Sequence, residues 1–91
     1  MTWKYFGRTG GTGAIRGIYR IPSEGYEGKF DLRHFDVMER LRQDGRWIVE
    51  PDLPENDWMK GWFNEADEIT ADDIEALVKK WNTEGWPGNR G

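Results

Sequence analysis

The sequence predicts an α+β fold, in which an antiparallel sheet of four strands is followed by a short helix and by a capped C-terminal helix packed on one face of the sheet. Three observations lead to this prediction. Apolar and polar side chains alternate in the first half of the chain, Asp44-Gly45 has the composition of a hairpin turn, and apolar residues near the C-terminus recur at helical spacing. A length of 91 residues is typical of one domain.

The first two strands are expected over residues 3–8 and 14–21, where apolar and polar side chains alternate with the period of a half-buried strand. Residues 9–13 have the sequence Thr-Gly-Gly-Thr-Gly, a flexible connection that suits a hairpin. Residues 22–28 are rich in Pro, Ser and Gly, and we expect a loop there.

Residues 29–43 fit two structures. The apolar residues that recur every third position, as on a helix, are Leu32, Phe35, Met38 and Leu41. A strand face would use Phe35, Val37 and Leu41 instead. The following Asp44-Gly45 favours the strand, because this dipeptide is a strong signal for a type I′ hairpin turn. We therefore expect a long hairpin with residues 34–42 paired to residues 46–50.

A short helix is expected next. Pro51 and Pro54 end the sheet pattern, and Pro54 suits a first helical turn. The apolar stripe of this helix would consist of Trp58, Met59, Trp62 and Phe63. Gly61 weakens the helix by about 1 kcal/mol relative to Ala.

The C-terminal helix has the clearest signals. Thr70 has the character of an N-cap, and Asp72 and Asp73 place carboxylates in the first turn, where the helix dipole favours them. One apolar face follows, made of Ile74, Leu77, Val78 and Trp81. Gly85 and the following Pro87 end the helix. We expect one domain over residues 1–84 and a flexible tail over residues 85–91.

The core is expected to rely on Trp, because Leu, Ile, Val and Phe together number only 17 of 91 residues. Three of the six Trp lie on predicted apolar faces, namely Trp3, Trp47 and Trp81. The absence of Cys excludes disulfides and thiolate zinc sites. With no apolar run that suits a signal peptide or a membrane span, a cytoplasmic protein without membrane contact is expected.

Charge is divided unevenly along the chain. Residues 1–48 have a net charge of +3 and residues 49–91 have a net charge of −7. The two halves could attract each other within the domain, or they could form two surfaces with different partners.

Part of the chain resembles small bacterial or phage-encoded orphan proteins. The likeness covers about residues 35–82 and depends on the hairpin sequence of residues 44–51, on Trp62-Phe63, and on the segment of residues 69–77 that begins Ile-Thr. It implies a hairpin ending in Arg-Trp that is followed by a capped terminal helix. The resemblance implies no functional residues.

No catalytic constellation emerges, so we expect a protein that is not an enzyme and that uses no cofactor and no metal. The glycine-rich residues 7–13 match neither phosphate-binding fingerprint, and we expect a mobile hairpin loop. The sole histidine, His34, could pair with Asp36 on a strand, but no nucleophile signature accompanies it. The acidic residues 65–75 lack the Gly of a calcium loop.

An interaction module that binds an unknown protein partner is therefore the expected function. Candidate contact residues are the Trp that the core does not require, Trp58, Trp62 and Trp86, and an open sheet edge is a second candidate. A monomer or a homodimer is expected, since a single-layer sheet leaves one face open.

The alternative is a protein that binds single-stranded nucleic acid through a basic and aromatic sheet face. Its candidate residues are Lys4, Phe6, Arg8, Arg16, Arg20 and Arg40. A pI of about 5.0 argues against this alternative, because nucleic-acid-binding domains are usually basic.

Overall fold

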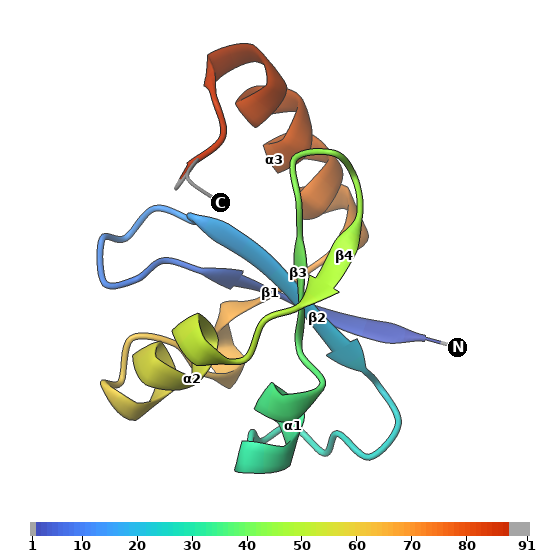
Figure 1. The fold of residues 1–91 in the computed structure, drawn as a ribbon, viewed down its shortest axis with the longest axis vertical. Helices are drawn as coiled ribbons and strands as arrows, with labels where there is room; N and C mark the ends of the chain where they lie inside the picture. The colour runs from blue at the N-terminus through green and yellow to red at the C-terminus, as the bar shows by residue number, and fades with distance from the viewer. Residues whose placement is uncertain (1, 88–91) are drawn as a thin grey trace.

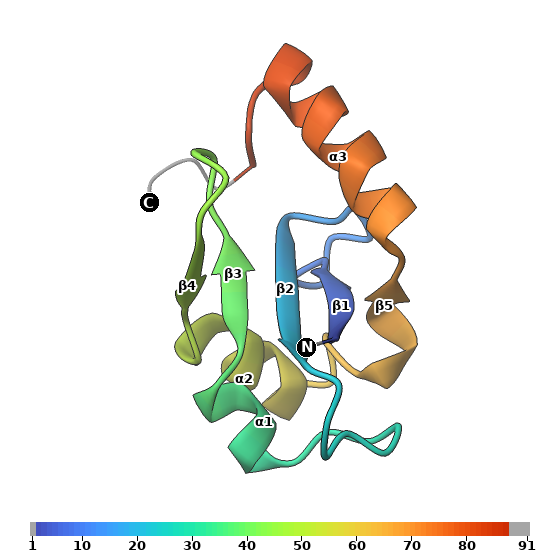
Figure 2. The same cartoon turned by 90° about the vertical axis from the view of Figure 1, so that its right-hand side faces the viewer.

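The computed structural model describes residues 2–87 and has an α+β fold with a five-stranded antiparallel sheet in the order β4-β3-β2-β1-β5 (Figures 1 and 2). The strands are β1 (Trp3–Arg8), β2 (Gly17–Pro22), β3 (Glu39–Leu41), β4 (Trp47–Val49) and β5 (Glu68–Ile69). The helices are α1 (Leu32–Asp36), α2 (Asp52–Met59), the 3-10 turn η1 (Glu65–Asp67) and α3 (Ala71–Glu84). The α+β class is confirmed, and β5 is a strand that the sequence did not predict.

The predicted hairpin of β1 and β2 is confirmed, with Phe6 opposite Tyr19. Its loop is longer than expected because β2 begins at Gly17 rather than at Ala14. The N–H of Arg16 donates to the carbonyl oxygen of Arg8 at 2.7 Å, which closes the loop at the end of β1.

The prediction of a strand over residues 34–42 is wrong for its first part, which forms α1. The Asp31 side chain accepts a hydrogen bond from the Arg33 N–H, and His34 Nδ1 accepts the Asp31 N–H at 2.9 Å. This capping box satisfies backbone donors at the helix start and stabilises the helix against the strand. Only the end of the segment enters the sheet, as β3.

The hairpin around Asp44-Gly45 is confirmed, although its turn is not of type I′. Among the described residues only glycines have positive φ, so Gly45 at φ 88° is the single left-handed residue of the turn. The Gly45 N–H bonds to the Arg42 carbonyl, and the Arg42 N–H bonds to the Arg46 carbonyl at 2.7 Å. This pattern is typical of a three-residue loop that ends in a left-handed glycine.

Helix α2 is shorter than the apolar stripe predicted for it. It ends at Met59, because Gly61 takes a φ of 80°. Trp62 and Phe63 therefore follow the helix instead of continuing it. Phe63 turns back under the sheet and is fully buried.

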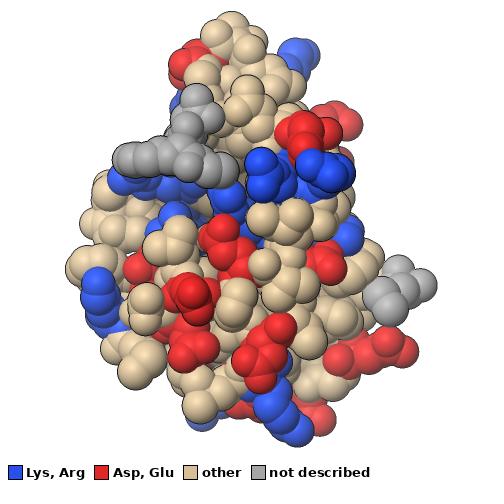
Figure 3. All heavy atoms as spheres, viewed as in Figure 1, with Lys and Arg blue, Asp and Glu red and all other residues tan. Residues whose placement is uncertain are grey.

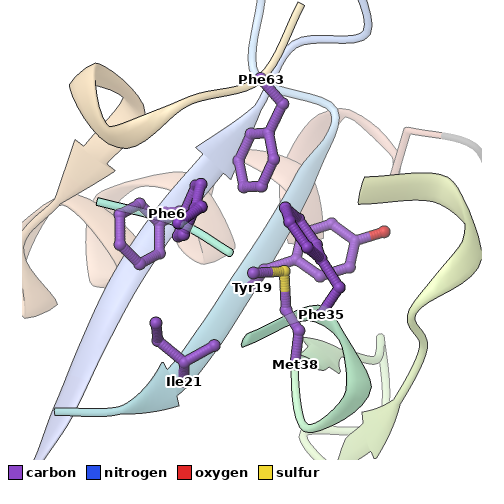
Figure 4. Close-up of a cluster of buried hydrophobic side chains, with 7 residues drawn as sticks. Phe6, Tyr19, Ile21, Phe35, Met38 and Phe63 are labelled. Carbon is purple, nitrogen blue, oxygen red and sulfur yellow. The ribbon is translucent and has the colours of Figure 1, made fainter. Parts of the chain in front are cut away.

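The main core lies between the sheet and the helices α1 and α2 (Figure 4). We call it the phenylalanine core, because it contains all the Phe of the chain; its buried members are Phe6, Tyr19, Ile21, Phe30, Phe35, Met38 and Phe63. The rings pack tightly, with Phe30 and Phe63 stacked at 5.4 Å between centroids. The expected reliance of the core on Trp is therefore wrong on this side of the sheet.

A smaller core lies on the opposite side, under α3. Its buried members are Ile18, Leu41 and Trp81, and half-buried side chains of α3 such as Leu77 pack around them. Helix α3 therefore packs on one face, as predicted, but the other face is covered by α1 and α2 rather than open to solvent. Of the three Trp expected in the core only Trp81 is buried, whereas Trp3 and Trp47 are half-buried.

The predicted N-cap of α3 is confirmed. Thr70 Oγ1 accepts the Asp73 N–H at 3.1 Å, and Asp73 Oδ2 accepts the Thr70 N–H at 2.9 Å. These reciprocal bonds form a capping box with Asp in the position usually held by Glu. At the other end the Gly85 N–H donates to the Trp81 carbonyl, and residues 88–91 of the expected tail lie outside the described residues.

We predict that Phe63→Ala lowers the free energy of unfolding by about 3 to 5 kcal/mol, because it leaves a cavity in the phenylalanine core. Urea denaturation measures this change. Met59→Ala is the matched control, since Met59 is 70% exposed and its loss should cost less than about 0.5 kcal/mol. Equal effects of the two substitutions would contradict the placement of Phe63.

We predict that Thr70→Ala lowers the free energy of unfolding by about 1 kcal/mol through loss of the N-cap. Thr83→Ala is the control in the same helix, because the Thr83 hydroxyl only bonds the Lys79 carbonyl on the exposed surface. Thermal unfolding, monitored by circular dichroism, should give the Thr83 variant the same melting temperature as the unmodified chain. The cap assignment fails if the Thr70 variant is as stable as the Thr83 variant.

Candidate protein interaction surface

Part of the sheet face that carries α3 is left without a helix. In the view of Figure 2 the strands β1 to β4 lie side by side with no helix in front of them, while α3 extends upward from β5. Residues directly opposite each other on paired strands project from the same face of a sheet. Tyr5 is opposite Arg20, Arg20 is opposite Glu39, and Glu39 is opposite Val49, so these four side chains share this face.

Two tryptophans join them, because side chains of a strand alternate between faces. Trp3 lies two residues before Tyr5 on β1, and Trp47 lies two residues before Val49 on β4. We call this surface the aromatic face and define it by Trp3, Tyr5, Arg20, Trp47 and Val49. Val49 is 56% exposed, and the other members are half-buried.

Arg20 is the centre of the aromatic face. Its guanidinium carbon lies 3.7 Å from the ring centroid of Trp3 and 4.2 Å from that of Trp47. Both distances are well within the range of cation–π attraction. The two indoles come from strands on either side of β2, so Arg20 bridges them across the sheet. Tyr5 extends the group, with its ring centroid 6.1 Å from that of Trp47.

Glu39 fixes the guanidinium from a third direction. Arg20 Nε donates to Glu39 Oε1 at 2.7 Å, and the two side chains are only 19% and 24% exposed. A charge-assisted hydrogen bond of this length restricts the Arg20 rotamer. The aromatic face is therefore a preformed apolar surface around one balanced ion pair.

The three Trp predicted to bind a partner do not form one surface. Trp58 is half-buried against Phe35, with ring centroids 5.0 Å apart. Trp86 packs edge-on against Trp81 at 5.0 Å, and its Nε1 donates to Asn82 Oδ1 at 2.8 Å. These two Trp belong to cores on opposite sides of the sheet.

Of these three Trp, Trp62 is the exposed residue, with 46% of its surface accessible, but its ring also packs against another part of the protein. A Cβ at Gly11 would lie 3.1 Å from Trp62 Cδ2, so the indole packs directly on the backbone of the glycine-rich loop. The Lys60 ammonium lies 4.8 Å from the centroid of the same ring. Trp62 thus holds the loop against the end of α2, a role that its sequence did not indicate.

The six residues proposed for nucleic-acid binding are also divided. Strand pairing places four of them, Lys4, Phe6, Arg8 and Arg40, on the face of the phenylalanine core. Arg20 lies on the opposite face, and Arg16 lies in the loop before β2.

Acidic side chains pair with most of these basic residues. Lys4 pairs with Glu68 at 3.4 Å, Arg8 with Asp57 at 2.7 Å, and Arg40 with Glu50 at 3.0 Å. On the side of the molecule drawn in Figure 3, acidic and basic side chains both appear, with Lys and Arg mostly toward α3 and Asp and Glu mostly toward α1 and α2.

A polar network at the border of the phenylalanine core could not be predicted from the sequence. Asp57 of α2 is 6% exposed and pairs with Arg8, whose Nε atom is buried without a hydrogen-bond partner. Next to them the Tyr19 hydroxyl donates to Glu50 Oε2 at 2.7 Å. No local pattern marks Asp57 as buried, because the contact depends on how α2 docks on the sheet.

The remaining candidates for chemistry are occupied or dispersed. The sole histidine, His34, accepts the backbone N–H that caps α1 through its Nδ1 atom. Within residues 2–87 no three His, Asp or Glu side chains are grouped in a way that could hold a metal ion. Over the same residues, every helix is too short or too polar to cross a bilayer.

We predict that the stability of the protein falls more steeply above about pH 10 than the stability of Tyr19→Phe. Burial, followed by the hydrogen bond and the charge of Glu50, raises the pKa of Tyr19 far above its usual value of 10.0. Above pH 10 the unfolded tyrosine loses its proton and the folded one keeps it, so ionisation stabilises the unfolded state. The difference approaches about 1.4 kcal/mol per pH unit.

Chemical denaturation at a series of alkaline pH values measures this difference. The two proteins should give parallel curves at neutral pH, offset by the loss of the hydroxyl contact. Curves that remain parallel above pH 10 would show that the Tyr19 hydroxyl is not buried in the folded state.

Comparison of the chain with protein-family models, with curated proteins and with solved structures finds no match. The function is therefore argued from the aromatic face itself.

Proposed function

We propose that this protein is a small non-enzymatic interaction module that binds a protein partner through the aromatic face. The observation that carries the proposal is the contact of Arg20 with Trp3 and Trp47 beside α3, on strands that no described helix crosses in the view of Figure 2. Trp, Tyr and Arg are the residue types that most often dominate the energy of protein interfaces. Here they are held in place before binding, which lowers the entropy cost of association.

The chemistry of the aromatic face suits an apolar partner surface that also offers hydrogen-bond acceptors. The indoles of Trp3 and Trp47 and the ring of Tyr5 supply apolar area. The Arg20 guanidinium has more N–H donors than the one that Glu39 accepts, so it can also donate a hydrogen bond to a neutral carbonyl oxygen of the partner. An apolar patch with such a polar centre is typical of an interface.

Single-stranded nucleic acid is the alternative occupant, because bases stack on aromatic side chains of a sheet. We favour a protein because Arg20 on this face is already paired with Glu39, which leaves no net charge for the phosphates. The net charge of −4 further opposes the binding of a polyanion.

The proposal predicts a protein adduct when a photoreactive benzophenone analogue of phenylalanine replaces Tyr5 in the full chain. The variant is irradiated in a lysate of the native cell, and the adduct is identified by mass spectrometry before and after nuclease treatment. The same analogue at position 62 is the matched control, since Trp62 is exposed but lies outside the aromatic face. Only the position 5 variant should form the adduct.

The identified partner is then titrated against the unmodified chain and against Trp3→Ala. We expect the substitution to weaken binding about tenfold or more, as is typical when an aromatic anchor is truncated. Circular dichroism establishes that the variant is folded. An adduct that nuclease removes would favour the nucleic-acid alternative, and unchanged affinity of the Trp3 variant would exclude the aromatic face as the protein-binding surface.

A further inference from the structure

The outer edge of β4 is an unpaired strand edge. β4 is the last strand of the sheet, and among the described residues it pairs with β3 alone. The Arg42 N–H bonds to the Arg46 carbonyl, and the Glu50 N–H bonds to the Met38 carbonyl. In an antiparallel ladder, pairs that exchange hydrogen bonds alternate with pairs that do not. Trp47 and Val49 are in the second kind of pair, so their backbone N–H and C=O groups point away from β3.

This edge is complementary to itself. If two copies of β4 lie antiparallel about a two-fold axis at Ile48, Trp47 of each copy stands opposite Val49 of the other. Those are the residues whose backbone groups point outward, so each such pair can exchange both of its hydrogen bonds. Both side chains lie on the aromatic face, so the Trp47 ring would cover the exposed Val49 of the second copy.

Charge supports the same register. One step further along, Arg46 of each copy stands opposite Glu50 of the other. Glu50 is already bonded to Tyr19 and Arg40, and Arg46 to Asp44, so this register places opposite charges near each other without requiring a new ion pair. One step beyond that pair, Gly45 stands opposite Pro51, which has no N–H to donate. The self-complementary segment therefore runs from Arg46 to Glu50 and ends at Pro51 in both directions.

We propose that the edge of β4 binds a second copy of this chain, joining the two sheets into one continuous sheet. The pairing is isologous, as in most two-fold dimers. It goes beyond the proposed function, because the aromatic faces of the two copies become neighbours on one side of the joined sheet. The short contact is typical of a weak, concentration-dependent dimer.

Sedimentation of the full chain over a wide range of concentrations, up to the millimolar, tests the association. Backbone hydrogen exchange tests whether the β4 edge is the contact between the two copies. The Trp47 and Val49 amides should exchange several-fold more slowly in concentrated than in dilute solution. A chain that remains monomeric, or a dimer in which these two amides are not protected, would overturn the proposal.

Val49→Pro is the decisive variant, because the Val49 N–H points outward and its loss removes no hydrogen bond of the β3–β4 pair. We expect it to weaken the dimer about tenfold or more, since the donor is lost from both copies. Val49→Thr keeps the N–H and the β-branched shape, and it should associate like the unmodified chain. If Val49→Pro associates as strongly as the unmodified chain, the β4 edge is not the dimer contact. If that variant fails to fold, the amide exchange of the unmodified chain is the test.

The two proposals fail separately. The contact of Trp3 with Arg20 reaches the side chain of Trp47 but not the outward backbone groups of β4, so Trp3→Ala should keep the self-association. If Trp3→Ala binds the partner as well as the unmodified chain while the dimer still forms, only the proposed function is wrong. If partner binding depends on Trp3 but the dimer does not form through β4, only the present proposal is wrong.

Discussion

Successive side chains of β2 point to opposite faces of the sheet, and both sides of the molecule depend on that alternation. β2 pairs with β1 on one side and with β3 on the other, and it carries buried residues on both faces. Tyr19 faces the phenylalanine core and bonds Glu50, whereas the next residue, Arg20, faces away and bridges two indoles. A shift of register by one residue would exchange these two environments and expose the core.

The division between Phe and Trp explains how a chain with few aliphatic residues folds. All the Phe are buried between the sheet and the helices α1 and α2. Most of the Trp instead lie at the borders between the cores and the surface, where one part of the indole is packed and another faces solvent. Trp is large and carries a polar N–H group, so it is rarely buried completely. The main core therefore depends on Phe, whereas Trp81 fills the smaller core and the other Trp pack with part of each ring exposed.

Features set by local sequence could be predicted, namely the alternation of β1 and β2, the Asp44-Gly45 hairpin and the Thr70 cap. Helix α1 was missed because its capping box uses His34 where Glu or Gln is usual, and β5 was missed because two residues are too few to show a period. The aromatic face could not be predicted for a different reason. Trp3, Arg20 and Trp47 lie on three different strands, and only the register of the whole sheet brings them together.

The pairing of β1 with β5 has a consequence for the order in which the chain can fold. Tyr5 is opposite Ile69, so the first strand acquires its outer neighbour only after about 60 further residues have been synthesised. Contacts between such distant segments require a large loop to close, and they slow folding relative to local hairpins. During synthesis the β1–β2 and β3–β4 hairpins can form early. The sheet is completed, and α3 anchored beside it, only after β5 has paired with β1.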